Sequence, residues 1–370
     1  MKILFVTNYP SPYRVEFFNE LGKYCDVTVI FEEDIYSQRE RNVNWFNCNY
    51  SKFKAIFLKQ CKFGNKFICF DVKDYVCDKS FDLVIITNYS TLTEMYAIYC
   101  MNRRKIKFAI EIDGGMPKSG KGIIEKLKTK LISSAQWWFS TSKLSDDYLI
   151  TYGADKKNIF RYPFTSLNKS DVITEVISED KKSELKKSLN IKEKKVIISV
   201  GQFIHRKGFD ILLKSMKGIP REYGVYIVGG EPTEEYLKLK EELNLTNVHF
   251  EGFKTKEELK KYYMCADIFV LPTREDIWGL VINEAMANGL PIITTDKCVA
   301  GVELIKNNEN GFIIPVEDEK ELSDKIKVIC IDEHLRHTMM VNNLKKINEF
   351  TVERMVEVHL EIFEEIMKSK

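Results

Sequence analysis

Short apolar runs without polar alternation recur along the chain and constrain its fold more than any other feature. In the first half they lie at residues 3–7, 27–31, 83–87, 108–112 and 138–142. Runs of about five residues rich in Val, Ile and Phe are typical of parallel strands that are covered on both faces. Segments with helical periodicity separate them, at residues 15–22, 93–103 and 123–133. This order predicts a series of βαβ units and a parallel α/β sheet.

The same alternation begins again at Lys195. The later apolar runs lie at residues 195–201, 223–230, 247–253, 266–273, 290–296 and 311–316. The two sets share no convincing sequence identity, which indicates two domains of similar architecture rather than a repeat. A chain of 370 residues is long enough to bury two cores. We therefore predict an α/β protein with two Rossmann-like domains, at about residues 1–165 and 190–350, that face a central cleft.

Two further segments complete the predicted organisation. Residues 166–187 are polar and charged and lack an apolar period, so we expect the hinge between the domains there. Residues 352–370 have the pattern of an amphipathic helix, which must bury its apolar stripe. We expect this helix to return to the first domain. The predicted stripe consists of Met355, Val358, Ile362, Phe363 and Ile366.

Composition excludes several classes of protein. The 56 basic and 54 acidic residues give a net charge of +2, so no global field favours a nucleic-acid partner. Nine cysteines without CxxC pairs or metal-ligand spacing indicate reduced thiols and no metal site. No stretch approaches the roughly 18 apolar residues of a membrane span. We expect a cytoplasmic protein whose contact with a membrane, if any, is peripheral.

The segment TREDIWGLVINEA, from Thr273, has the pattern of a nucleotide site. It follows an apolar run and contains a glycine-bearing loop that leads into a helix. The free N–H groups of Leu280 and Val281, after Gly279, would begin that helix, where phosphate binds well. Glu284, one turn inside, could accept hydrogen bonds from both ribose hydroxyls. Asp276, in the loop, would meet the next part of the ligand, so one segment could hold ribose, pyrophosphate and sugar.

Two other turns of the second half are candidates for the same ligand. After its first apolar run the chain reads GQFIHRKG, and Arg206 and Lys207 stand at the predicted strand-to-helix turn, where cations suit an anion. The alternative is an ordinary solvated turn. Gly229 and Gly230 follow the next run, and glycine admits a close backbone approach to a nucleotide. An ordinary turn is again the alternative.

In DIWGLVINEAMANGLPII the spacing Asp-x7-Glu resembles the E-x7-E signature of retaining glycosyltransferases of family four, which have the GT-B fold. The resemblance covers nearly the whole chain. The second half matches through VGQFIHRKGFDILLKS, IVGGEP, NVHFEGF and ADIFVLPT, and the first half, more weakly, through NYPSPYR and STSKLSDDYLITYGADKKNIFRYPF. The family pattern implies that the second domain binds a nucleotide-sugar donor and the first domain binds the acceptor.

The resemblance also implies roles for single residues. Asp276 would contact the donor sugar, Glu284 the nucleotide ribose, and Lys207 the diphosphate. Three departures from the family pattern are visible. Gln202 stands where the family has an Arg after Gly201, so Arg206 would take the place of that Arg at the diphosphate. Asp276 stands where the family usually has Glu, so the adjacent Glu275 is an alternative for the contact with the sugar. All five His lie at position 205 or beyond, so Asp113, in EIDGG, takes the place of a first-domain His near the sugar.

The implied reaction is sugar transfer with retention of configuration. Breaking a sugar–phosphate bond builds negative charge on the leaving diphosphate. Arg206, Lys207 and the N-terminus of the predicted helix would stabilise this negative charge, so we expect neither a metal nor another cofactor. On family grounds the donor is a UDP-sugar, with GDP-mannose as the second choice. The acceptor is a glycan or lipid-linked saccharide, as in synthesis of surface polysaccharide.

Two features of the first half bear on the acceptor. Ser11 and Arg14 lie in a loop after the first predicted strand, where α/β sheets place ligands, so they could meet a phosphate or the acceptor. Alternatively, this loop only caps the next helix. The stretch from Lys118 to Lys130 is basic and amphipathic, which favours peripheral contact with an anionic membrane. We expect its lysines to face the membrane and its apolar side chains to pack on the first sheet.

Three alternatives remain open. A nucleotide-sugar epimerase of the same fold would act without an acceptor, but it would usually show His residues in both halves. A non-catalytic two-domain ligand-binding protein would normally carry an export signal, and none is predicted here. A metal-dependent glycosyltransferase of the GT-A fold would use an acidic pair such as Glu111 and Asp113.

Overall fold

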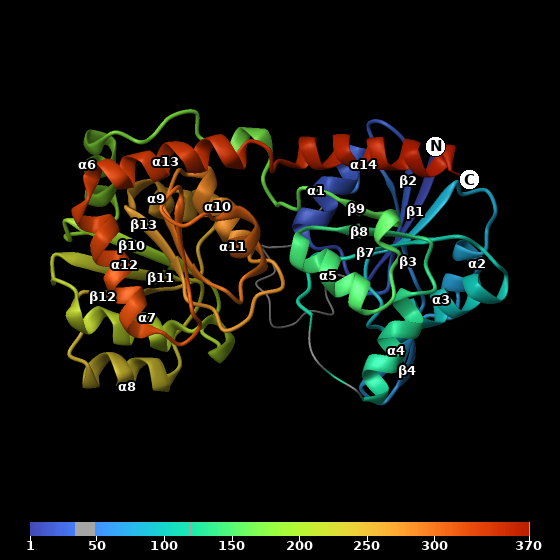
Figure 1. Cartoon of the computed structure of the whole chain (residues 1–370), viewed down its shortest axis with the longest axis horizontal. Helices are drawn as coiled ribbons and strands as arrows, with labels where there is room; N and C mark the ends of the chain where they lie inside the picture. The colour runs from blue at the N-terminus through green and yellow to red at the C-terminus, as the bar shows by residue number, and fades with distance from the viewer. Residues whose placement is uncertain (34–48, 118–119, 121, 370) are drawn as a thin grey trace. The chain divides into compact units, whose positions relative to one another are not determined.

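A computed structural model describes residues 1–33, 49–117, 120 and 122–369 of the chain (Figure 1). The chain forms two compact units. The first comprises residues 1–166 and 351–370, and the second comprises residues 167–350. Each unit is built on a parallel sheet with helices, so the predicted α/β fold with two parallel-sheet domains is confirmed.

The first unit has a seven-stranded sheet in the order β3-β2-β1-β6-β7-β8-β9, in which every neighbouring pair is parallel. The predicted runs form its five inner strands. The two edge strands were not predicted, because they are short and partly exposed. The strands are β1 (Lys2–Thr7), β2 (Asp26–Phe31), β3 (Lys54–Phe57), β6 (Leu83–Ile86), β7 (Ala109–Glu111), β8 (Trp137–Ser140) and β9 (Ile159–Arg161), with a separate hairpin of β4 (Cys61–Phe63) and β5 (Lys66–Ile68).

Helices cover both faces of this sheet. On one face, buried side chains of β1, β6 and β7 form a core with helices α2, α3, α4 and α5. On the other face, Phe5 of β1 contacts Phe17 of α1, and Phe139 of β8 contacts Phe363 of α14. Successive side chains of a strand point to opposite faces, which allows both cores. The helices are α1 (Pro12–Leu21), α2 (Val72–Val76), α3 (Leu92–Arg103), α4 (Ile123–Ile132), α5 (Lys143–Thr151) and α14 (Val352–Lys368).

The C-terminal helix α14 packs against α1 within the first unit (Figure 1). Four of the five predicted stripe residues are buried there, namely Met355, Ile362, Phe363 and Ile366. Val358 is only half-buried, and the neighbouring position, His359, has no exposed surface. A polar side chain therefore lies in the core face of this helix.

The second unit has a six-stranded parallel sheet in the order β12-β11-β10-β13-β14-β15. Every run predicted for this half is a strand. They are β10 (Lys195–Val200), β11 (Tyr223–Val228), β12 (Val248–Glu251), β13 (Ile268–Leu271), β14 (Ile292–Thr295) and β15 (Gly311–Ile314). Ile268 and Val270 of β13 point into a core with α7 and α12, whereas Phe269 between them contacts Tyr263 of α9. Helices thus cover both faces here as well.

The second unit contains helix α6, which we did not predict from the sequence. The helices of this unit are α6 (Glu179–Ser188), α7 (Phe209–Ser215), α8 (Glu234–Glu242), α9 (Lys256–Cys265), α10 (Leu280–Ala287), α11 (Val299–Leu304), α12 (Glu319–Ile331) and α13 (Glu333–Ile347). Helix α6 lies in the stretch where we expected the hinge, but the chain passes between the units at Ser166 and Leu167. The rest of that stretch belongs to the second unit.

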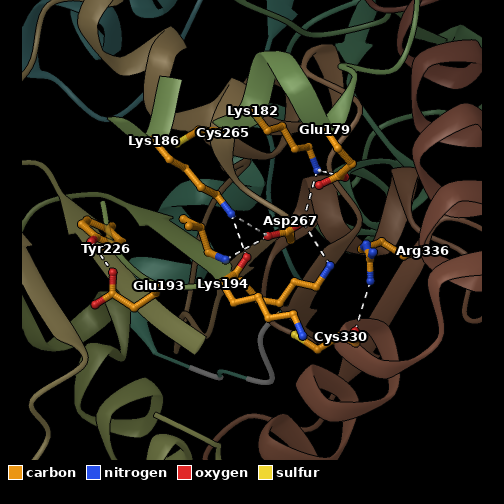
Figure 2. A network of polar contacts seen from close by, with 12 residues as sticks. Glu179, Lys182, Lys186, Glu193, Lys194, Tyr226, Cys265, Asp267, Cys330 and Arg336 are labelled. Atoms are coloured by element: carbon orange, nitrogen blue, oxygen red, sulfur yellow. Dashed lines mark hydrogen bonds and ion pairs between the residues drawn. The ribbon is translucent and has the colours of Figure 1, made fainter. Parts of the chain in front are cut away.

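A buried ion cluster explains why α6 joins the second unit. Figure 2 shows Lys182 and Lys186 of α6 directed at Asp267, which is 1% exposed at the start of β13. Their Nζ atoms lie 3.2 and 3.8 Å from the carboxylate oxygens, and Lys195 Nζ lies at 4.0 Å. Burial alone would raise the pKa of Asp267, but the three ammonium groups lower it. This charge balance needs the fold, because Lys182 is 85 positions from Asp267.

Among the described residues, no helix combines the length and the apolar character needed to cross a bilayer.

Candidate donor-binding site

The loops after β10 and β13 meet in the middle of the second sheet. These strands are neighbours, but the chain order reverses between them, and α/β sheets bind ligands at such a point. The N–H of Arg274 and the hydroxyl of Thr273 both donate hydrogen bonds to the carbonyl oxygen of Arg206, each at 2.8 Å. The topology therefore joins the two segments that the sequence singled out separately.

Gly208 allows this close approach. Its φ is +69°, and a Cβ at this position would lie 2.0 Å from the carbonyl oxygen of Pro272. A left-handed backbone in direct contact with another backbone requires glycine. Gly229 and Gly201 form a similar contact between the loops after β11 and β10, since a Cβ on Gly229 would lie 2.5 Å from the Gly201 carbonyl oxygen. Gly230, beside them, faces open space.

The basic pair and the first acid are in contact. Lys207 Nζ lies 2.5 Å from Asp276 Oδ2, and Arg206 Nη1 lies 3.0 Å from Asp276 Oδ1. Arg206 also donates to the carbonyl oxygen of Glu275 at 2.7 Å. The carboxylate of Asp276 thus faces both cations. The side chain of Gln202 is exposed, whereas Arg206 reaches this cluster.

The backbone of Asp276 is also fixed. Its N–H donates to the Lys297 carbonyl oxygen at 2.9 Å, and its own carbonyl oxygen accepts from the Val299 N–H at 3.2 Å. These bonds tie the loop after β13 to the start of α11.

Helix α10 begins beside this cluster. Gly279 precedes it with a φ of +102°, and a Cβ there would lie 2.8 Å from Cys298 Sγ. The Ile282 N–H donates to the Gly279 carbonyl oxygen at 2.8 Å. The N–H groups of Leu280 and Val281 stand before that bond, where a helix has no internal acceptors. Both residues are half-buried, so this end of the helix is accessible to an anion.

Glu284 has a partner that the sequence did not reveal. The Tyr263 hydroxyl of α9 donates to Glu284 Oε2 at 3.0 Å. Burial raises the pKa of Glu284 to about 7, although the Tyr263 hydrogen bond lowers it. Within the described part of the chain, Oε1 accepts no hydrogen bond and remains for a ligand hydroxyl. Tyr263 gave no signal in the sequence, because a buried tyrosine on a helix is common.

Arg274 is a second residue whose contacts the sequence did not reveal. Its guanidinium donates two hydrogen bonds of 2.8 Å to the carboxylate of Asp210 on α7 and one of 2.6 Å to the His205 carbonyl oxygen. It also pairs with Glu317. Arg274 thus holds the loop after β13 against the turn that carries the basic pair.

The candidates in the first unit form a separate cluster. Arg14 is 3% exposed, and its guanidinium pairs with the carboxylates of Glu111 and Asp113. The Tyr13 hydroxyl donates to Asp113 Oδ2 at 3.0 Å. Arg14 therefore points inward, and the Asp113 side chain, 30% exposed, is the member that reaches the surface. Ser11 is 3% exposed just before α1, and its hydroxyl does not cap that helix.

Metal ligation was the alternative role of this acidic pair. Both carboxylates are instead engaged by Arg14. Across the described ranges, no three His, Cys, Asp or Glu side chains are grouped so as to hold a metal ion.

Glycosyltransferases with the GT-B fold have these features. They consist of two parallel-sheet units, and glycine turns, a basic pair and two acids surround the start of a helix. Comparison with known proteins supports that class: residues 180–346 match the model of the family "Glycosyl transferases group 1". This part of the chain is therefore similar to group 1 glycosyltransferases, the class that the resemblance implied. The matched residues include the segments of the candidate site described above.

Curated relatives are distant. Over 247 residues the chain is 22% identical to the N,N'-diacetylbacillosaminyl-diphospho-undecaprenol alpha-1,3-N-acetylgalactosaminyltransferase of Campylobacter jejuni, covering 67% of this chain and 65% of that enzyme. It is 32% identical over 161 residues to CapM of Staphylococcus aureus, a capsular polysaccharide biosynthesis glycosyltransferase, covering 42% of each. The chain thus matches less than two thirds of the length of either relative.

Solved structures share the whole fold. A glycosyltransferase from Rickettsia africae superposes with a TM-score of 0.77 at 16% identity, covering 100% of this chain and 99% of that one. HepE of Anabaena, in complex with UDP and glucose, superposes with a TM-score of 0.72 at 16% identity and covers 99% of each chain. At this level of identity the likeness establishes the fold and no finer property.

Proposed function

We propose that the protein transfers a sugar from a nucleotide-sugar to a glycan or lipid-linked acceptor in surface polysaccharide synthesis, with retention of configuration. A UDP-sugar is the favoured donor and GDP-mannose the second choice. The observation that carries the proposal is the contact of Arg206 and Lys207 with Asp276 beside the start of α10. The relatives named above act on a diphospho-undecaprenol-linked sugar and in capsule synthesis, and HepE binds UDP. Those properties support the choice of donor and acceptor.

The proposed chemistry follows from charge. The bond between the sugar C1 and a diphosphate oxygen breaks, and the acceptor oxygen forms the new bond to C1 from the same face. The acceptor proton passes to a diphosphate oxygen, so no enzyme nucleophile is needed. Arg206, Lys207 and the first N–H groups of α10 stabilise the negative charge that develops on the leaving group. We propose that these groups suffice without a metal or another cofactor.

Asp276 would change partners during this cycle. Without donor, its carboxylate neutralises the basic pair. An arriving diphosphate carries more charge and would displace it, because cation–phosphate contacts are charge-assisted and strong. The freed carboxylate could then accept hydrogen bonds from hydroxyls of the sugar, while Glu284 holds the ribose. The loop backbone stays in place, since other bonds fix it.

The test combines binding and turnover. A thermal-shift screen against UDP- and GDP-sugars identifies the donor, and product analysis with and without acceptor separates transfer from epimerisation. Asp276→Asn should lower transfer about 100-fold or more, by analogy with the loss of one transition-state contact. It should bind free UDP at least as tightly as the wild type, because the competing carboxylate is gone. Asp296→Asn, which alters an exposed acid, is the control. Unchanged turnover in Asp276→Asn would refute the role.

We further propose that the protein contacts an anionic membrane through α4. We expected its apolar side chains to pack on the sheet, and Leu131 and Ile132 are indeed buried. For three others that expectation is wrong, since Ile123, Ile124 and Leu127 are 87%, 70% and 42% exposed. The exposed apolar surface, and not the lysines alone, is the argument for a membrane.

The α4 face (Ile123, Ile124, Lys126, Leu127 and Lys130) is continuous. At about 100° per residue, its three apolar side chains lie side by side, with the two exposed lysines along one edge. The opposite side of the helix is anchored, because the Tyr152 hydroxyl donates to Glu125 Oε2 at 2.9 Å. Such a face suits shallow insertion among acidic headgroups. Lys118 and Lys121, part of the predicted basic stretch, lie outside the described residues.

Vesicle co-sedimentation tests this contact. The wild type should bind phosphatidylglycerol vesicles and should bind phosphatidylcholine vesicles much more weakly. The triple change of Ile123, Ile124 and Leu127 to Gln should reduce binding about tenfold or more, since each side chain contributes over ~1 kcal/mol on burial. Ile331→Gln, which alters a 72% exposed side chain of the second unit, is the control. Equal binding by both variants would exclude the α4 face.

A further inference from the structure

His359 is a fully buried polar residue that the proposed reaction does not use directly. It lies on α14 among aromatic rings, and its ring stacks on Phe139 at 5.4 Å. Its Nδ1 lies 2.7 Å from the Met355 carbonyl oxygen. A carbonyl oxygen only accepts hydrogen bonds, so Nδ1 carries a proton. The other ring nitrogen, Nε2, lies 3.5 Å from Glu111 Oε2.

The contact between His359 and Glu111 requires a second proton. Both Nε2 and Oε2 are buried, and neither has a hydrogen-bond partner elsewhere in the described structure. Without a proton between them, two lone pairs would face each other in an apolar surrounding, which is costly. With a proton on Nε2, an imidazolium faces a carboxylate. His359, Glu111, Arg14 and Asp113 then alternate in charge and sum to zero.

This chain of charges ends at the surface. His359 and Glu111 have no exposed side-chain surface and Arg14 has 3%, but Asp113 has 30%. Asp113 follows the carboxyl end of β7, the edge at which parallel sheets bind ligands. The Tyr13 hydroxyl also donates a hydrogen bond to the Asp113 carboxylate. The buried members therefore determine how Asp113 is presented.

We propose that His359 and Glu111 are positioning residues for the transfer reaction, which fix Arg14 and, through it, the carboxylate of Asp113. The inference rests on the proposed function and on the place of Asp113 after the carboxyl end of β7, where a parallel sheet binds ligands. His359 would thus contribute to the first unit from helix α14, through its contact with Glu111 and not through contact with the sugar. Glu111 and Tyr162 are the titratable groups that contact His359. Arg14 pairs with Glu111 and Asp113, and Tyr13 donates to Asp113.

Removing the two charges singly and together distinguishes a positioning role from a merely structural one. His359→Gln and Glu111→Gln each leave one unbalanced buried charge, so each should lower kcat for transfer about 10- to 100-fold through misplacement of Asp113. The double variant removes one charge of each sign and should recover to within about threefold of the wild type. UDP affinity should not change in any of them, because the Glu284 site is in the other unit. His337→Gln, which alters an exposed histidine, should have no effect.

A second measurement does not depend on activity. Nitrogen-15 NMR of histidine-labelled wild-type protein should show a proton on both ring nitrogens of His359. An unprotonated Nε2 would overturn the inference, as would single variants with full kcat or a double variant no better than the singles. If the wild type transfers no sugar from any donor, the proposed function fails, and the NMR result still decides whether the charge chain exists.

Discussion

Lowering the pH should weaken nucleotide binding through Glu284. The Tyr263 hydroxyl holds one carboxylate oxygen at 3.0 Å, and burial raises the pKa of the acid to about 7. An ionised carboxylate can accept hydrogen bonds from both ribose hydroxyls, whereas the protonated acid accepts them poorly. Because the pKa is raised, the binding form is lost as the pH falls below about 7. At pH 8 the ionisation of Glu284 is nearly complete.

The size of the effect follows from that pKa. The ionised fraction of an acid with a pKa of about 7 falls from ~0.9 at pH 8 to ~0.1 at pH 6, which is about tenfold in affinity or ~1.4 kcal/mol. Two charged hydrogen bonds are stronger than two neutral ones by about 2–3 kcal/mol, which is the upper limit for the loss of binding free energy when Glu284 is protonated. The predicted tenfold change lies within it. Tyr263→Phe removes a contact that lowers the pKa, so the midpoint should move to higher pH.

Isothermal calorimetry with UDP at pH 6, 7 and 8 provides the assay. The terminal phosphate of UDP also titrates, near pH 6. That titration is common to the wild type and Glu284→Gln, so the ratio of their Kd values isolates Glu284. The ratio should change about tenfold between pH 8 and pH 6. A ratio independent of pH would refute the ribose role of the ionised carboxylate.

Further predictions concern the framework of the second unit. Lys182→Met keeps the buried stem but removes one of three cations around Asp267, so we expect a loss of about 2–3 kcal/mol in unfolding free energy and about 4–10 °C in Tm. The neighbouring Lys181→Met alters an exposed ion pair and should cost less than about 1 kcal/mol; equal effects in urea unfolding would contradict the account. The difference should begin to narrow as the pH falls below 3.8, the ordinary pKa at which the unfolded chain takes up the proton, and should vanish once the pH passes the lowered pKa of Asp267 in the folded protein. Gly208→Ala should raise the Kd for UDP at least about tenfold through its clash with the facing loop, and Gly64→Ala, with a similar φ of +59° and open space, should not.

The sequence determined the class of fold and most of its strands. Buried parallel strands are apolar on both faces, so β1, β10 and β13 were visible as uninterrupted runs. The edge strands β3 and β9 lacked that signal, because solvent covers part of them. The strand–loop–helix that carries Asp276 and Glu284 was also visible, since its spacing is local.

Only the tertiary structure decided how buried charges and exposed apolar groups are matched. Arg14 could be read as a ligand for phosphate until the sheet order brought it to Glu111 and Asp113, about 100 residues away. His359 joined them because α14 packs against the first sheet. The side of α4 that faces solvent was equally undetermined. The free energy of a buried charge depends on its nearest partners in space, and strand order and helix packing choose those partners. Local sequence patterns carry no record of that choice.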